Sequence, residues 1–190
     1  MNKLVPLLFA SLLLFGCIGD SPEASNQTAS PSISAFGAVV GDEVSVNYVG
    51  WFEENSTKFV FDSNIEFEAQ KAGLPPRLNY LPLNFTIGSG QVIKGFDEAV
   101  IGMQEGEMKT VEVQPEEAYG FYNESLVYEF NKTILQNNGS NIEPGQYLLS
   151  NSGARGKIIE VRNETFLIDY NHFLAGRTLY FELHLLDYAR

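Results

Sequence analysis

Alternation of apolar and polar residues along the chain predicts a protein built mainly from β-strands. Residues 178–187 show the pattern most clearly, because large apolar side chains fall on one face while Glu182 and His184 fall on the other. The apolar face consists of Leu179, Phe181, Leu183 and Leu185. Residues 43–52 alternate in the same way. Shorter alternating or apolar runs occupy residues 59–61, 83–87, 107–113, 157–161 and 165–170.

Residues 95–102 have helical rather than strand character. Phe96, Val100 and the neighbouring Met103 fall on one face at helical spacing. Gly102 suits the end of this helix, because glycine adopts the left-handed backbone conformation that commonly follows a last turn. Many strands around one short central helix predict an antiparallel α+β domain.

A second helix is predicted over residues 65–72. The run Ser63-Asn64-Ile65-Glu66 fits a capping box, in which the first and fourth side chains bond to backbone N–H groups of the first turn. Gly73 and the pair Pro75-Pro76 then end the helix.

Composition narrows the possible functions. The chain has 190 residues, enough for one medium domain or a small domain with an insertion. Its net charge is -12, and such a surface repels phosphate backbones, so nucleic-acid binding is not expected. With one cysteine and two histidines, no internal disulfide and no metal cluster are expected. No cofactor is expected either.

Residues 1–17 form a candidate signal peptide. Lys3 precedes an apolar stretch that is short for a membrane span, and Gly16-Cys17 closes it. This ending resembles the lipobox of prokaryotic lipoproteins, which implies cleavage before Cys17 and a lipid on its sulfur. A plain secretion signal, or an uncleaved anchor with an incidental cysteine, is the alternative. Residues 18–36 are rich in Ser, Ala and Pro and predict a flexible linker.

Asn-x-Ser/Thr sequons are more frequent than composition predicts. Seven begin at Asn26, Asn55, Asn84, Asn123, Asn131, Asn138 and Asn163. Random placement of the same residues would give roughly 1.7. The excess suggests an exported protein in an organism that glycosylates asparagine. Alternatively, Asn, Ser and Thr cluster because they share turn preferences.

Several ordered motifs then identify a family. VNYVGWF, FVFDSN, LNFTIGSGQVIKGFDEAVIGMQEGE, PEEAYG and AGRTLYFELHLLD resemble, in the expected order, the motifs of FKBP-type peptidyl-prolyl cis-trans isomerases. The resemblance implies an α+β fold, with an antiparallel sheet wrapped on a short helix, formed by residues 37–120 and 171–190. It also implies catalysis of rotation about X-Pro bonds without a cofactor.

Two inserts extend this pattern. AYGFYNESLV and NHFLAGRTLYF resemble the borders of the insert-in-flap domain of SlyD-like FKBPs. Residues 121–170 would then be a small all-β chaperone domain. Residues 64–82 resemble the lengthened loop of longer archaeal members. The expected partners are unfolded or proline-containing polypeptides and, through the lipid anchor, the extracytoplasmic face of the cell membrane. A monomer is expected.

The resemblance also implies a set of site residues. The residues expected to act in catalysis are Tyr48, Asp62, Ile93 and Tyr119. Those expected to bind substrate are Phe61, Leu83, Val92, Phe96, Phe173 and Phe181. Ile93 would give a backbone N–H to a substrate carbonyl, and Tyr119 a phenolic hydrogen bond. Asp62 would face the twisting carbonyl or hold Tyr48 through its hydroxyl.

Two departures from single-domain FKBPs leave this pocket apolar. Phe96, the expected floor under the proline ring, stands where tryptophan is usual, and Leu83 stands where an aromatic residue is usual.

Two of these residues have an alternative role. Asp62 could cap the helix expected after Ser63, and Tyr119 could be an ordinary buried tyrosine. His172 is expected to stabilise a turn rather than carry a proton. A non-catalytic holdase or peptide-binding lipoprotein is the alternative function.

Overall fold

The computed structural model describes residues 37–135, 141–150 and 152–190. Cys17, the expected signal peptide and the linker lie outside the described residues, as do the sequons at Asn26 and Asn138. Within the described residues, no helix combines the length and the apolar character needed to cross a membrane.

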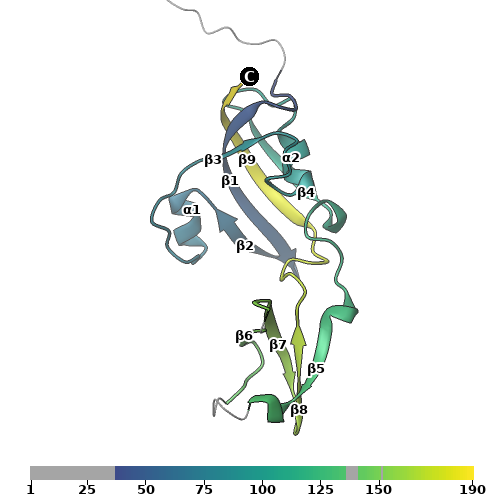
Figure 1. Ribbon diagram of the computed structural model, residues 1–190. Helices are drawn as coiled ribbons and strands as arrows, with labels where there is room; N and C mark the ends of the chain where they lie inside the picture. Colours follow the sequence, from purple (N-terminus) through teal and green to yellow (C-terminus); the bar gives the residue numbers. More distant parts are fainter. Residues whose placement is uncertain (1–36, 136–140, 151) are drawn as a thin grey trace, which may run out of the picture. The chain divides into compact units, whose positions relative to one another are not determined.

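Five antiparallel strands form the first sheet (Figure 1). Its order is β2 (Thr57–Ser63), β1 (Glu43–Glu54), β9 (Leu179–Ala189) and β4 (Met108–Val113). A fifth strand, β3 (Leu83–Thr86), pairs with the first part of β1. The antiparallel α+β prediction is therefore confirmed, and the strand at the C-terminal end of the chain lies in the middle of the sheet.

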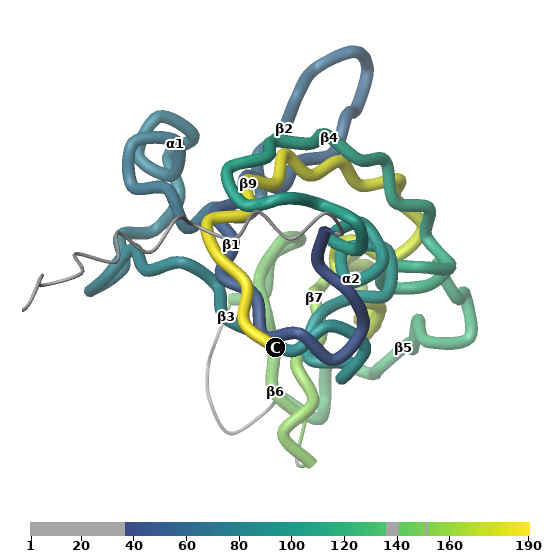
Figure 2. The backbone as a smooth tube through the Cα atoms, turned by 90° about the horizontal axis from the view of Figure 1, so that it is seen from above, coloured from purple at the N-terminus to yellow at the C-terminus, as the bar shows by residue number. Residues whose placement is uncertain are grey.

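The sheet curves around helix α2 (Lys94–Val100), as Figure 2 shows. The face of β9 predicted to be apolar is buried, with Leu179, Leu183 and Leu185 fully inaccessible to solvent. Phe96 and Val100 of the helix belong to the same core cluster. The helix is thus fixed by apolar burial on the concave side of the sheet, and this places its first turn beside the site described below.

Helix α1 (Glu66–Lys71) begins differently from the prediction. Its N-cap is Ile65, and no side chain caps it. Ser63 ends strand β2, where its hydroxyl donates to the Tyr48 carbonyl oxygen at 2.9 Å and accepts from the Ile65 N–H at 3.0 Å. The capping box is therefore wrong, because Ser63 is held by a contact across the sheet that local sequence does not reveal.

Asn64 extends this connection between strand β1 and the loop that follows. Its buried amide accepts from the Tyr48 N–H at 2.7 Å and donates to the Val46 and Leu81 carbonyl oxygens at 2.9 and 3.2 Å. One side chain thereby satisfies backbone groups of β1 where its pairing on this edge passes from β3 to β2. It also fixes the ends of the segment spanning residues 64–82.

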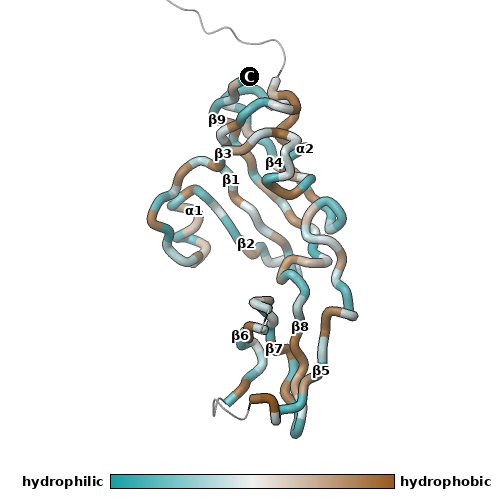
Figure 3. The backbone as a smooth tube through the Cα atoms, in the orientation of Figure 1, coloured by the Kyte–Doolittle hydropathy of each residue, from teal (hydrophilic) through white to brown (hydrophobic). Residues whose placement is uncertain are grey.

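A second sheet has four antiparallel strands, in the order β5 (Val127–Asn131), β8 (Thr165–Asp169), β7 (Arg155–Val161) and β6 (Tyr147–Leu149). It has its own core, centred on Ile158, Phe166 and Ile168. Figure 3 shows hydrophobic stretches in both sheets, in agreement with two separate cores. Gly156 permits close packing in the second core, since a Cβ there would lie 2.2 Å from Ile168 Cγ2.

Short 3-10 helices occupy the remaining connections: η1 (Pro115–Glu117), η2 (Glu124–Leu126) and η3 (Lys132–Leu135). The two chain segments that lead into and out of the second sheet are hydrogen-bonded to each other. The Asn171 side chain accepts from the Asn123 N–H and donates to the Asn123 carbonyl oxygen, both at 2.9 Å. Gly176 N–H donates to the Gly120 carbonyl oxygen at 2.8 Å.

Candidate active site

A largely apolar cavity of about 430 Å³ opens on the concave side of the first sheet. It is lined by Tyr48, Phe61, Asp62, Leu83, Gly90, Gln91, Val92, Ile93, Phe96, Tyr119 and Phe181. Of the site residues expected from the sequence, all that the structure describes line this cavity except Phe173. They come from β1, β2, β3, β9, helix α2, the loop before α2 and the loop after η1.

Phe96 forms a rigid floor for this cavity. Its side chain is 3% exposed, and three aromatic rings pack against it edge-on. The centroid distances are 5.6 Å to Tyr48, 5.8 Å to Phe85 and 5.2 Å to Phe181. Edge-to-face packing of this kind is favourable for aromatic rings and leaves little freedom to rotate.

The loop before α2 presents Val92 and Ile93 to the cavity. The Ile93 carbonyl oxygen accepts from the Phe96 and Asp97 N–H groups, which starts the helix. Among the described residues, the Ile93 N–H has no hydrogen-bond acceptor. It is therefore available to a carbonyl oxygen bound in the cavity, as the resemblance implies.

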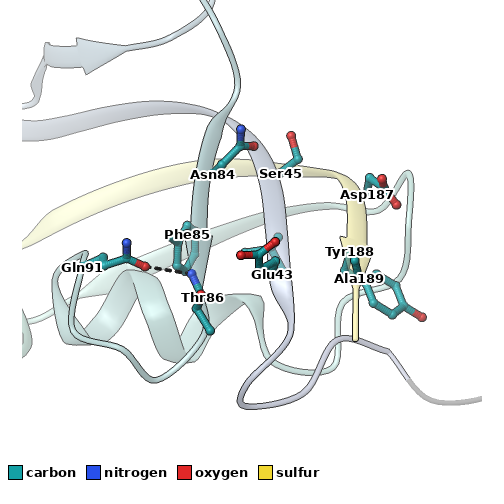
Figure 4. A pocket seen from close by; sticks show the side chains of 10 residues that line it. Glu43, Ser45, Asn84, Phe85, Thr86, Gln91, Asp187, Tyr188 and Ala189 are labelled. Carbon is teal, nitrogen blue, oxygen red and sulfur yellow. Dashed lines mark hydrogen bonds between the residues drawn. The ribbon is translucent and has the colours of Figure 1, made fainter.

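Gln91 fixes this loop to strand β3. Its Oε1 accepts from the Thr86 N–H at 2.9 Å, a bond drawn in Figure 4, and from the Ser89 hydroxyl at 2.8 Å. Gln91 also borders a second hollow of about 300 Å³, shown in Figure 4. That hollow carries Glu43, Ser45, Asn84 and Asp187, and such a polar lining does not suit a proline ring.

Tyr48, Asp62 and Arg77 form a hydrogen-bonded group at the edge of the cavity. The Tyr48 hydroxyl donates to Asp62 Oδ2 at 2.7 Å, and the Arg77 guanidinium contacts Asp62 Oδ1. Burial, followed by the Asp62 carboxylate, raises the pKa of Tyr48 well above its usual value, so the phenol stays protonated. Asp62 therefore holds Tyr48, one of the two roles expected for it, and it does not cap α1.

Arg77 was missed by reasoning from the sequence. It follows Pro75-Pro76 in the segment spanning residues 64–82, where the pattern gives no reason to single out a cation. In the folded protein this segment lies beside the pocket, and the guanidinium of Arg77 contacts the carboxylate of Asp62. A carboxylate bonded on both oxygens is fixed in orientation, which in turn fixes the Tyr48 ring.

Tyr119 also lines the cavity, and its side chain is 40% exposed. Burial, followed by the charge of Asp62, raises the pKa of Tyr119, so its hydroxyl is a proton donor at neutral pH. Among the described residues, that hydroxyl has no hydrogen-bond partner. The ring stacks on His172 with a centroid distance of 3.8 Å and an interplanar angle of 10°.

His172 stabilises a turn, as expected. Its Nδ1 accepts from the Leu174 N–H at 3.2 Å, and Leu174 is buried in the main core. Burial lowers the pKa of His172, so the imidazole is neutral at pH 7 and able to accept this bond. The stacked pair adds a role that the sequence did not suggest, because His172 supports the Tyr119 ring from outside the cavity.

Phe173 is the exception among the expected pocket residues. It is 59% exposed and lines a separate cavity together with Tyr122 and Tyr170. Among the described residues, no group of three or more His, Cys, Asp or Glu side chains is arranged to hold a metal ion.

Comparison with known proteins agrees with the geometry. The family model described as FKBP-type peptidyl-prolyl cis-trans isomerase matches residues 37–186. A short-type peptidyl-prolyl cis-trans isomerase of Methanocaldococcus jannaschii is 38% identical over 148 residues, covering 77% of this chain and 91% of the relative. The resemblance of residues 64–82 to longer archaeal members stays a prediction.

Two bacterial isomerases are also similar to this chain in sequence. The isomerase SlyD of Helicobacter pylori is 33% identical over 132 residues, which cover 65% of this chain and 70% of the relative. An FKBP-type 16 kDa isomerase of Escherichia coli is 27% identical over 115 residues, covering 58% of this chain and 76% of the relative. The family model covers far more than half of the chain, and the chain belongs to the FKBP-type peptidyl-prolyl cis-trans isomerase family.

Proposed function

We propose that this isomerase acts by moving the X-Pro peptide bond out of water and stabilising its twisted form. Rotation about the bond must overcome a barrier of about 18–20 kcal/mol, because resonance across C–N is lost. The planar amide is more polar than the twisted one. An apolar cavity therefore disfavours the ground state relative to the transition state. The cavity floored by Phe96 is the observation that supports this mechanism.

Two donors orient the substrate in this mechanism. The Ile93 N–H binds a carbonyl oxygen of the substrate chain, and the Tyr119 hydroxyl binds a second one. Both donors lack partners among the described residues and both belong to the cavity wall. At the polar edge of the cavity, the Asp62 carboxylate is bonded to Tyr48 and Arg77. A bound proline therefore meets no unpaired charge there.

Replacement of Tyr119 by phenylalanine is expected to lower kcat/KM for a short proline peptide about five- to tenfold, the value of one hydrogen bond to a partly exposed group. The ring and its stack on His172 would remain. Tyr128→Phe is the matched control, because this half-exposed tyrosine lies on β5 outside the cavity. Equal kcat/KM for Tyr119→Phe and wild type would remove Tyr119 from the proposed mechanism.

We propose further that residues 121–170 form an insert-in-flap domain that holds extended segments of client proteins. One face of its sheet exposes large apolar side chains, namely Tyr147, Leu149 and Ile159. Exposed apolar residues grouped on a small sheet are typical of a surface that binds other chains. A client held there would bring its prolines to the isomerase cavity at a raised local concentration.

We propose that the protein is exported and anchored on the extracytoplasmic face of the membrane by a lipid on Cys17. The sequence of residues 1–17 and the linker at residues 18–36 support this. The sequon asparagines that the structure describes are all exposed, which is compatible with glycosylation after export. They are Asn55, Asn84, Asn123, Asn131 and Asn163.

Peptide mass spectrometry of the native protein tests the export proposal. We expect the N-terminal peptide to begin at Cys17 and to carry the mass of a lipid, and glycans on exposed sequons. Cys17→Ser is the control, and after membrane fractionation this variant should no longer be found with the membranes. An N-terminal peptide that starts before Cys17, or an unmodified thiol there, would contradict the anchor. Bare asparagine at every sequon would contradict glycosylation.

A further inference from the structure

A second large cavity, of about 550 Å³, lies against the outer face of the second sheet. Arg155, Lys157 and Ile159 alternate along β7 and point toward it, while Gly156 and Ile158 between them are buried on the core side. Tyr147 of β6 pairs with Lys157 across the sheet and lines the same cavity. The other wall is formed by Asp169 at the end of β8, by residues 170–173, 175 and 177 that follow it, and by Tyr122.

Positive charge gathers in this cavity although the protein as a whole carries a net charge of -12. Arg155, Lys157 and Arg177 line it, with Asp169 as the acidic member. Among the described residues, neither Arg155 nor Lys157 forms an ion pair. Arg155 instead lies over the Tyr147 ring, 4.0 Å from its centroid. These two cations are therefore available to a negatively charged ligand.

Apolar surface surrounds the cations. Tyr122, Tyr147 and Phe173 line the cavity and remain 47%, 48% and 59% exposed. Exposed aromatic rings beside arginine are the combination that carries most binding energy at protein interfaces. A ligand that fits must therefore offer apolar or aromatic side chains together with carboxylates.

The cavity also adjoins the isomerase site through a pair of stacked rings. His172 belongs to the cavity, and Tyr119 belongs to the apolar pocket. The two rings are in contact at a centroid distance of 3.8 Å. A chain bound in the cavity therefore needs only a few residues to reach the proline pocket, since an extended residue spans about 3.3 Å.

We propose that this cavity selects its clients, and that it binds extended polypeptide segments in which acidic residues accompany aromatic or aliphatic ones. The proposal rests on the holding function proposed above and adds the chemical class of the client. Charge complementarity is the argument for this occupant. The unpaired cations of the cavity attract acidic segments, whereas the rest of this acidic protein repels them, so such segments are directed to the cavity.

Fluorescence anisotropy of the full chain with labelled peptides tests the proposal. The peptides share one proline and the same aromatic residues, and they carry three aspartates, three asparagines or three lysines. We expect the aspartate peptide to bind about tenfold tighter than the lysine peptide at low salt, with a difference that shrinks as salt increases. The variant Arg155→Gln/Lys157→Gln should weaken the aspartate peptide about tenfold and leave the asparagine peptide unchanged.

The matched control is Lys132→Gln/Arg162→Gln, which removes two positive charges from the same part of the chain but outside the cavity. It should change the affinity for the aspartate peptide less than twofold. Equal binding of the aspartate and lysine peptides would overturn the charge selection, as would equal effects of the two double variants. If the peptides bind regardless of charge, the holding function stands. If none binds, the holding function and the client class both fail.

Discussion

Replacing Phe96 with alanine will cost about 3–5 kcal/mol of the free energy of unfolding and remove nearly all isomerase activity. The side chain is 3% exposed and touches the rings of Tyr48, Phe85 and Phe181. Removing it leaves a void that the rigid sheet cannot close, and it removes the floor against which the proline ring packs. Urea unfolding measures the change in stability. An assay of cis-to-trans rotation in a proline tetrapeptide, made on the folded fraction, measures the loss of activity.

Two further substitutions separate stability from catalysis at this position. Phe96→Leu keeps most of the apolar volume, so this variant should fold. It should retain measurable activity that is lower than that of wild type, because leucine packs less well against the proline ring. Phe173→Ala is the matched control, because this phenylalanine is 59% exposed and lies outside the pocket. It should change the free energy of unfolding by less than about 0.5 kcal/mol. A Phe96→Ala protein of wild-type stability and activity would contradict the assignment of the floor.

Removing residues 121–170 will lower catalysis of proline-limited protein refolding about 100-fold while a tetrapeptide is still turned over. The segments at the two ends of this stretch are hydrogen-bonded through Asn123 and Asn171, so a short Gly-Ser linker can join Gly120 to Asn171. The main core and the second core are separate, so the first sheet should still fold. The expected loss follows from the effective concentration that a tethered client gains.

Refolding of an unfolded protein with a slow prolyl isomerisation step measures this effect. The tetrapeptide assay on the same variant is its control, because a short peptide does not span both cavities. We expect kcat/KM for the tetrapeptide to stay within about twofold of wild type. Equal catalysis of refolding with and without residues 121–170 would contradict the holding role.

Local patterns predicted much of this structure. In a strand with one buried face, apolar and polar side chains alternate, and this alternation is visible in the sequence. The alternation of Leu179, Phe181 and Leu183 matches the fully buried side of β9. The helix of residues 95–102 lies within one or two residues of α2. Family motifs placed most of the cavity wall, since their residues come from separate strands that no local pattern could bring together.

The failures of prediction share a physical cause. Ser63 suggested a capping box, but its hydroxyl bonds to Tyr48 on the neighbouring strand. Arg77 gave no signal, because its role depends on how residues 64–82 return to Asp62. Strands β5 and β6 were not predicted individually, since the pairing of short, exposed strands depends on their partners rather than on their own sequence.

The most direct test of the central claim is a protease-coupled assay of cis-to-trans rotation in a proline tetrapeptide at neutral pH. Wild type is compared with Asp62→Ala/Tyr119→Ala, which removes the carboxylate that holds Tyr48 and the free phenol of the cavity. We predict clear catalysis by wild type and a loss of at least about 30-fold in kcat/KM for the double variant. If wild type and variant both matched the uncatalysed rate, the protein would be a binding module rather than an isomerase.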